Sequence, residues 1–181
     1  MTQWTDDHFI AGHVVLDFAN TVYRRTPELG ADLFDSGEAL AGWITYAGLL
    51  PTTPYADDVV LREARTLRSL FWQLFDAQYD AREVPTEVLG RLLDAARETL
   101  AGDVSLAPDG TLTPRDVQGA CAVLAFRGIE LVLNPPDRPV RRCDRCGWFF
   151  LDHSRGRRRR WCSMKTCGNQ AKAARYRAAH A

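Results

Sequence analysis

Residues 141–170 read Arg141-Arg-Cys143-Asp-Arg-Cys146-Gly-Trp-Phe-Phe-Leu-Asp-His-Ser-Arg-Gly-Arg-Arg-Arg-Arg-Trp-Cys162-Ser-Met-Lys-Thr-Cys167-Gly-Asn-Gln170. Four of the five cysteines lie here, in the pattern C-x2-C-x15-C-x4-C. Two residues between the first two cysteines let both sulfurs face one metal ion, and Gly147 permits the tight turn that follows. The pattern predicts one structural zinc ion held by Cys143, Cys146, Cys162 and Cys167.

Disulfides or unlinked buried thiols are the alternatives for these cysteines. The first residues of the chain lack the basic region and apolar run of a signal peptide, so we expect a cytoplasmic protein, in which disulfides are rare. The segment 138–181 is also too short to form a stable core of its own without a cross-link such as a bound metal ion. Zinc is therefore the favoured interpretation. Because four thiolates leave no coordination position for water, we expect no catalysis at this ion.

Charge is strongly polarised along the chain. Residues 138–181 hold eleven arginines and two lysines against two aspartates, a net charge of +11, whereas residues 1–137 carry −11. A cationic module of this kind is typical of proteins that bind polyphosphate. The residues that we predict to contact nucleic acid are Arg155, Arg157, Arg158, Arg159, Arg160, Lys165, Asn169, Gln170, Lys172, Arg175 and Arg177. A solvated charge run, or docking onto the acidic first domain, is the alternative.

These residues carry a family resemblance. The tail resembles the CGNR zinc finger, and the region before it resembles the ABATE domain that usually precedes this finger in bacterial proteins. The matching residues are Cys143 to Asp152, Ser154-Arg155, Arg160 to Met164 and Cys167-Gly168-Asn169. Gln170 departs from the pattern, since the family name places an arginine there; glutamine keeps hydrogen-bonding ability but loses the charge and the bidentate fork. The resemblance implies a stress-induced transcription regulator.

The remaining chain predicts a helical first domain. Apolar spacing of three and four indicates helices from Ser36 to Gly48, from about Asp57, after Thr86, and after Thr113 to Asp116, where Thr113 is expected to cap and Pro114 to open the last helix. The fifth cysteine, Cys121, lies in that helix and is expected to be buried. A turn at 107–110 between alternating runs predicts a β-hairpin. We therefore expect an α+β protein with domains at 1–136 and 137–181.

Three polar residues interrupt the apolar segment 13–23. Asp17, Asn20 and Thr21 share one face if the segment is helical. They could line a pocket for a small-molecule effector. The alternative, which we favour on general grounds, is that they hydrogen-bond a neighbouring loop.

The finger is expected to have a treble-clef arrangement. Val140–Arg142 and Trp148–Leu151 would form a hairpin around the first cysteine pair, and a helix would carry the last ligand. Trp148, Phe149, Phe150 and Trp161 could stack on bases or form the small core of the finger, in which we expect Trp161 and one phenylalanine.

Three functions fit this sequence. The first is a DNA-binding transcription regulator that binds duplex DNA, with a first domain that senses a signal or forms a homodimer. The others are an RNA-binding protein and a protein-interaction module. An enzyme is not expected, because adjacent residues such as Asp152, His153 and Ser154 cannot form a catalytic triad. No apolar run in the sequence is long enough to span a membrane.

Overall fold

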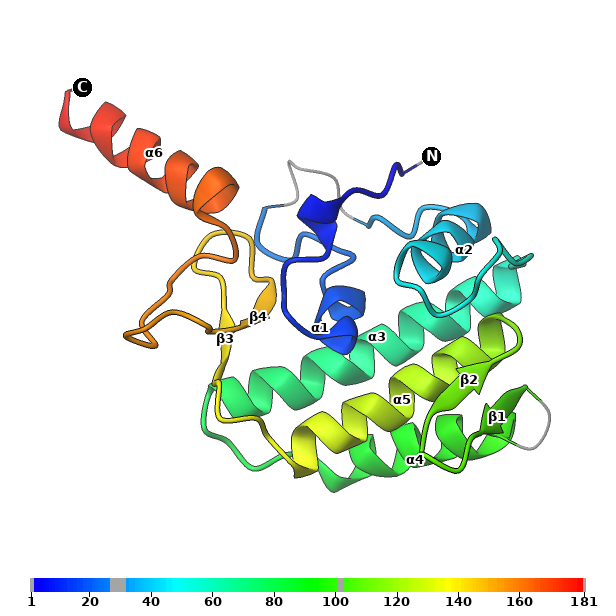
Figure 1. The fold of residues 1–181 in the computed structure, drawn as a ribbon. Coiled ribbons are helices and arrows are strands. Elements are labelled where there is room, and N and C mark those ends of the chain that lie inside the picture. The colour runs from blue at the N-terminus through cyan, green and yellow to red at the C-terminus, as the bar shows by residue number, and fades with distance from the viewer. Residues whose placement is uncertain (1, 27–31, 101–102, 181) are drawn as a thin grey trace.

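The computed structural model describes residues 2–26, 32–100 and 103–180, with side chains left out at 98–100. Three long helices run alongside one another and form the body of the first domain (Figure 1). They are α3 (Asp58–Tyr79), α4 (Thr86–Leu100) and α5 (Val117–Leu133). The short helices α1 (Val14–Ala19) and α2 (Gly37–Tyr46) cover α3, preceded by the 3-10 turn η1 (Asp6–His8). The mostly helical first domain is therefore confirmed.

Helix α3 shows how the sequence produces this bundle. The Asp57 carboxylate accepts hydrogen bonds from the amides of Val59 and Val60 and so begins the helix. Residues three and four apart then form one buried stripe, as predicted, comprising Leu61, Ala64, Leu67, Leu70, Phe71, Leu74 and Phe75. The stripe contains one charged residue, Arg68, which pairs with Asp32 at 2.6 Å.

Helix α5 packs very close to α3 at one glycine. A Cβ atom at Gly128 would lie 2.3 Å from Cε1 of Phe71. Only a residue without a side chain fits there, so the close packing of α5 on α3 depends on glycine at this position.

The start of α5 differs from the prediction. Thr113 and Pro114 belong to strand β2 (Leu112–Pro114), which pairs with β1 (Val104–Leu106) in the expected hairpin. The cap is Asp116, whose carboxylate accepts a hydrogen bond from the amide of Gly119. The predicted cap at Thr113 and first-turn proline are wrong, because the β-ladder continues through both residues and a second capping residue follows.

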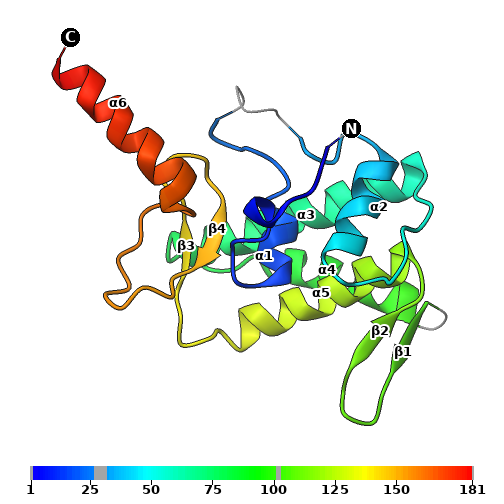
Figure 2. The ribbon, with the colours of Figure 1, turned by 45° about the horizontal axis from the view of Figure 1, so that its top comes forward.

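The finger follows the predicted order of elements. Strands β3 (Val140–Arg142) and β4 (Phe149–Leu151) form an antiparallel hairpin. The turn η3 (Met164–Gly168) then leads into α6 (Asn169–Ala179). None of the eleven residues of α6 is buried, and the helix runs away from the rest of the molecule in both views (Figures 1 and 2). Among the described residues, no helix has the length and apolarity needed to cross a membrane.

One hydrophobic core crosses from the helical domain into the finger. The ring of Phe149 lies 5.6 Å from the ring of Phe75 on α3, edge to face. Tyr23 stacks on Trp148 at 4.9 Å. The four metal-site cysteines belong to the same buried cluster as the leucines of α3. The finger therefore packs against the first domain as part of one core.

Backbone hydrogen bonds strengthen the same contact. The amide of Leu151 on β4 donates to the carbonyl of Ala11 at 2.8 Å, and the amide of Arg25 donates to the carbonyl of Cys146 at 3.3 Å. The side chain of Asn20 donates to the carbonyl of Phe149 at 2.8 Å and accepts from the amide of Phe149 at 2.7 Å. Asn20 thus acts toward β4 as a neighbouring strand would.

Candidate metal centre and nucleic-acid interface

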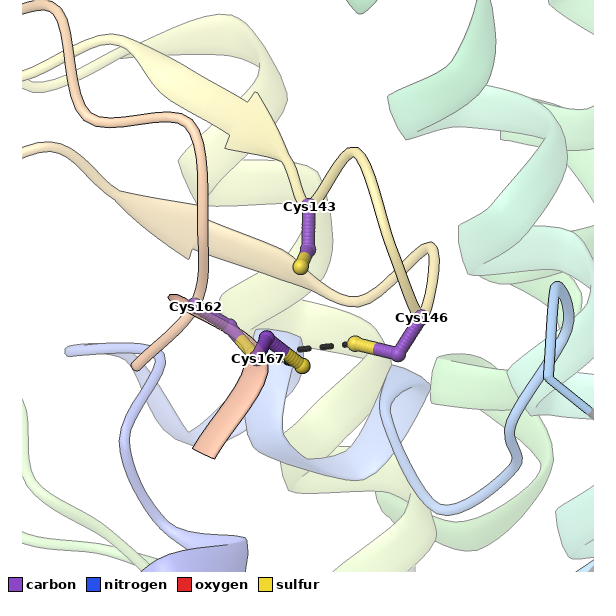
Figure 3. A group of neighbouring side chains, drawn as sticks. All are labelled: Cys143, Cys146, Cys162 and Cys167. Atoms are coloured by element: carbon purple, nitrogen blue, oxygen red, sulfur yellow. Dashed lines mark hydrogen bonds between the residues drawn. The ribbon is translucent and has the colours of Figure 1, made fainter. Parts of the chain in front are cut away.

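The four predicted cysteines meet at one point. Their Sγ atoms all lie within 4.8 Å of one another, and all four residues are buried. Cys143 and Cys146 come from the loop between β3 and β4, Cys162 precedes η3, and Cys167 lies within η3 (Figure 3). The sulfurs point toward a common centre, whereas Cys121 lies elsewhere on α5.

Their spacing fits a tetrahedral zinc ion. A Zn–S bond of about 2.3 Å requires neighbouring sulfurs to be about 3.8 Å apart in a tetrahedron. The Cys146 and Cys162 sulfurs are 3.6 Å apart, and those of Cys162 and Cys167 are 3.7 Å apart. A disulfide would require about 2.0 Å, and all four cysteines are free. The site fits one structural zinc ion.

Electrostatics also favour a bound cation. Hydrogen bonds from the other three thiols lower the pKa of Cys143, whereas hydrogen bonding to Cys143 raises the pKa of both Cys146 and Cys162. Four thiolates can coexist at this distance only around a cation, and zinc would supply that charge.

The backbone around the ligands is fixed by short turns. The amide of Cys143 donates to the carbonyl of Trp148 at 2.7 Å, and the amide of Gly147 donates back to the carbonyl of Cys143 at 3.0 Å. Gly147 has φ +81°, which favours glycine, as the sequence predicted. The amide of Asp144 donates to the carbonyl of Arg160, and this contact joins the two cysteine pairs.

Comparison with family models agrees with this geometry. Residues 12–135 match the ABATE model, described as "Putative stress-induced transcription regulator", and residues 140–180 match the CGNR zinc finger. The chain belongs to the ABATE family. It carries a CGNR zinc finger after that domain, in the predicted order. No curated protein matches the chain. The two matches end and begin on either side of the predicted boundary at 136, although the core is shared across it.

Most of the predicted nucleic-acid contacts lie on the surface of the CGNR finger. Arg155, Arg157 and Arg158 are exposed on the loop after β4, and Lys172, Arg175 and Arg177 are exposed on α6. Lys165 is exposed and lies 3.5 Å from Asp7. Asn169 and Gln170 are exposed at the start of α6, where Asn169 donates to the carbonyl of Lys165. Their role in nucleic-acid binding stays a prediction.

Two of the predicted contacts have structural partners inside the finger. The Arg159 guanidinium donates to the carbonyls of Trp161 and Cys162 and lies over the ring of Phe150 at 4.6 Å. Arg160 pairs with Asp144 at 2.7 Å. Arg159 is therefore held against the metal-binding segment, and the charge of Arg160 is partly offset.

Three of the four finger aromatics are inside the core. Trp148, Phe149 and Phe150 are each at most 4% exposed, so they have no free face for a base. The expectation that Trp161 and one phenylalanine form the core understated this burial, because the core of the first domain also reaches β4. Trp161 is half-buried, with the Arg160 guanidinium 5.3 Å from its ring centre.

The proposed effector residues lie at the contact between the domain and the finger. A carboxylate oxygen of Asp17 accepts from the amide of Ala11, and Asn20 pairs with Phe149. The Thr21 hydroxyl donates to the carbonyl of Phe18 and accepts from Arg68. All three residues are at most 6% exposed. Asp17 thus bonds a neighbouring loop, as the favoured interpretation expected, whereas Asn20 bonds strand β4 and Thr21 bonds α1 and α3.

Sequence reasoning missed two residues of this region. Arg145 lies between the first two ligands and lines a groove beside α6. Its position between Cys143 and Cys146 was the sequence feature that could have identified it. Arg142 pairs with Asp76 at 2.7 Å and with Asp80 at 3.2 Å across the domain contact. Nothing in the sequence links that arginine to α3, because the pair is separated by about sixty residues and depends on the packing.

Proposed function

We propose that this protein is a transcription regulator whose zinc-stabilised finger binds duplex DNA through exposed cations. The observation that carries the proposal is the distribution of charge in the finger. Both of its aspartates are engaged internally: Asp144 pairs with Arg160, and Asp152 accepts from the amides of Ser154 and Arg159. Most of the positive charge is therefore left for an external polyanion.

The described contacts support an external partner over docking onto the acidic first domain. Where the finger meets that domain, the ion pairs use Arg142 with Asp76 and Asp80, and Lys165 with Asp7. Among the described residues, the cations of α6 and of the 155–158 loop have no acidic partner in the first domain. A helix without buried residues is also free to enter a groove of DNA.

The first domain would receive the signal in this proposal. A cavity of about 710 Å³ lies between α3, α4 and α5, lined both by apolar side chains such as Leu67 and by charged ones such as Arg62 and Arg91. This volume suits a small-molecule effector. Cys121 lies in its wall, half-buried, and burial raises its pKa to about 12, so it remains a thiol. A homodimer through this domain would present two fingers to two half-sites.

We propose a binding role and no catalysis for the finger. Four thiolates would complete the coordination of zinc, and the ion would then hold the fold without activating water.

Fluorescence anisotropy across a salt series tests this function. We expect the zinc-loaded protein to bind random duplex DNA with an affinity that falls steeply as salt rises, with a slope of about 0.9 per phosphate neutralised. Binding to single-stranded RNA alone would replace the proposal with an RNA-binding function. Binding to neither at low salt would contradict it and favour a protein partner.

The test variant replaces Arg155, Arg157 and Arg158 with alanine and leaves Arg159 and Arg160, which have internal contacts. The matched control replaces Arg82, Arg97 and Arg115, three exposed arginines of the first domain that do not line the cavity between α3, α4 and α5. Both variants lose three charges. Only the first should weaken binding and reduce the salt slope, to a similar degree for all sequences; equal effects would point to net charge alone.

A further inference from the structure

The finger contains a small groove beside α6. It has a volume of about 330 Å³ and is lined from three segments of the chain. The loop between Cys143 and Cys146 contributes Asp144 and Arg145, and the segment before Cys162 contributes Arg160 and Trp161. One face of α6 contributes Gln170, Ala171, Ala174 and Arg175. The two alanines leave the space open, because larger side chains at these positions would fill it.

The charges of this groove are not balanced. Asp144 is the one acid that lines it in the described part of the chain, and its carboxylate pairs with Arg160 at 2.7 Å. Among the described residues, no acid pairs with Arg145 or Arg175. Two guanidinium groups therefore border one small space without a counter-ion, and guanidinium groups bind phosphate oxygens with paired hydrogen bonds.

We propose that this groove holds a single backbone phosphate of the bound DNA between Arg145 and Arg175. The inference rests on the proposed function and specifies which face of α6 is in contact with the DNA. The volume is at the low end for ligand sites, so it takes one phosphate group with its neighbouring sugar and not a whole helix.

Gln170 is placed to act beside this phosphate. It lines the groove at the start of α6, whereas its exposed neighbour Asn169 does not. The carboxamide donates to a phosphate oxygen or makes paired hydrogen bonds to the edge of adenine. The Gln170 position thus determines whether the groove adds neutral hydrogen bonding or charge to the contact.

The groove predicts that Arg145 and Arg175 act together. Both guanidinium groups would contact one phosphate, so the loss of either removes most of the benefit of the other. Arg177, also exposed on α6 but outside the groove, would act independently. These two arrangements differ in a double-mutant cycle.

The experiment measures duplex DNA binding by the full-length zinc-loaded protein at fixed salt. Arg145→Ala and Arg175→Ala are each expected to lower affinity about tenfold, and the double variant by much less than a hundredfold. Arg177→Ala should lower it less, and its effect should multiply independently with that of Arg145→Ala. Multiplicative effects for Arg145 and Arg175, or an equal loss from Arg177→Ala, would overturn the inference.

A second pair of variants tests the same groove without removing an arginine. Gln170→Glu and Asn169→Asp each add one negative charge at adjacent exposed positions of α6. Gln170→Glu, inside the groove, should reduce affinity at least fivefold more than Asn169→Asp. Equal losses would show that the DNA contacts α6 elsewhere.

Inorganic phosphate separates the source of the anion. Phosphate at millimolar concentration should not reproduce the Arg145- and Arg175-dependent binding that DNA shows. Saturation of the groove by inorganic phosphate, with DNA affinity unchanged in Arg145→Ala and Arg175→Ala, would make it a free-anion site and refute the proposal. If the wild-type protein binds no nucleic acid at all, the proposed function fails first, which is a distinct result.

Discussion

Asn20 provides a sharp test of how the helical domain holds the finger. Its carboxamide both donates to and accepts from the backbone of Phe149, at 2.8 Å and 2.7 Å, and the residue is 2% exposed. Asn20→Ala removes both partners at once and leaves the amide and the carbonyl of Phe149 without them. The burial of this strand leaves little room for water to replace the lost groups.

The size of the effect follows from those two groups. A buried donor or acceptor without a partner costs about 1–3 kcal/mol. For the two groups together, we therefore expect Asn20→Ala to reduce the free energy of unfolding by about 2–6 kcal/mol. For a chain of this length, each kcal/mol corresponds to a Tm lower by about 2–4 °C.

Chemical denaturation of the zinc-loaded protein, followed by circular dichroism at 222 nm, measures this change. Asn169→Ala is the matched control, because that side chain is exposed and makes one long hydrogen bond, of 3.3 Å, to Lys165. The control should stay within about 0.5 kcal/mol of the wild type. We also expect Asn20→Ala to release zinc to a chromophoric chelator faster, since β4 adjoins the first cysteine pair. A loss below about 0.5 kcal/mol, with zinc release unchanged, would refute this account of the domain contact.

Three further predictions concern the metal, the helix packing and pH. Removal of zinc by a chelator, or Cys146→Ser, should lower the Tm of the helices together with that of the finger in one transition, because Phe149 packs on α3. An unchanged Tm of the helical signal would show instead that the first domain and the finger unfold independently. Gly128→Ala should destabilise by about 1–3 kcal/mol, because its Cβ would meet Phe71, whereas Gly90→Ala on α4, with open space around it, should be neutral or stabilising; equivalent denaturation midpoints for the two variants would contradict the packing. Burial raises the pKa of Asp17 from 3.8 to about 7, so folding favours the protonated form and stability falls as pH rises from about 4 to 7. Asp17→Asn should abolish this loss, which is at most about 1.4 kcal/mol per pH unit, and parallel stability profiles for variant and wild type would disprove it.

Local patterns in the sequence predicted the elements well. The stripe of α3, the hairpin at β1 and β2 and the four metal ligands each depend on spacing between nearby residues, which the chain displays directly. The start of α5 was predicted at Thr113 because threonine, proline and aspartate there match a capping signal. The structure instead continues the β-ladder to Pro114, paired with Val104. Pairing with a distant strand overrode the local signal.

The contact between domain and finger could not be predicted in the same way. Asn20 and Phe149 are 129 residues apart, and Arg142 reaches Asp80 over 62 residues. Charge counting placed Arg159 with the other finger arginines, although its guanidinium is bound to carbonyls beside Cys162. Composition gives the sum of the charges, but only packing decides which of them remain available to a partner.

The hydrophobic core that the first domain and the finger share links the zinc site to the helices. The two family matches meet at about residue 137, and this suggests two modules joined in series. The buried cluster nevertheless continues from Phe75 on α3 through Phe149 to the cysteines. Cys143 and Cys146 lie in the loop between β3 and β4, and β4 packs against α1 and α3. A change in α1 or α3 would therefore alter the position of β4 and of these two ligands. If the first domain binds a signal, as proposed, that signal would reach the finger through side-chain packing, because the two share one core.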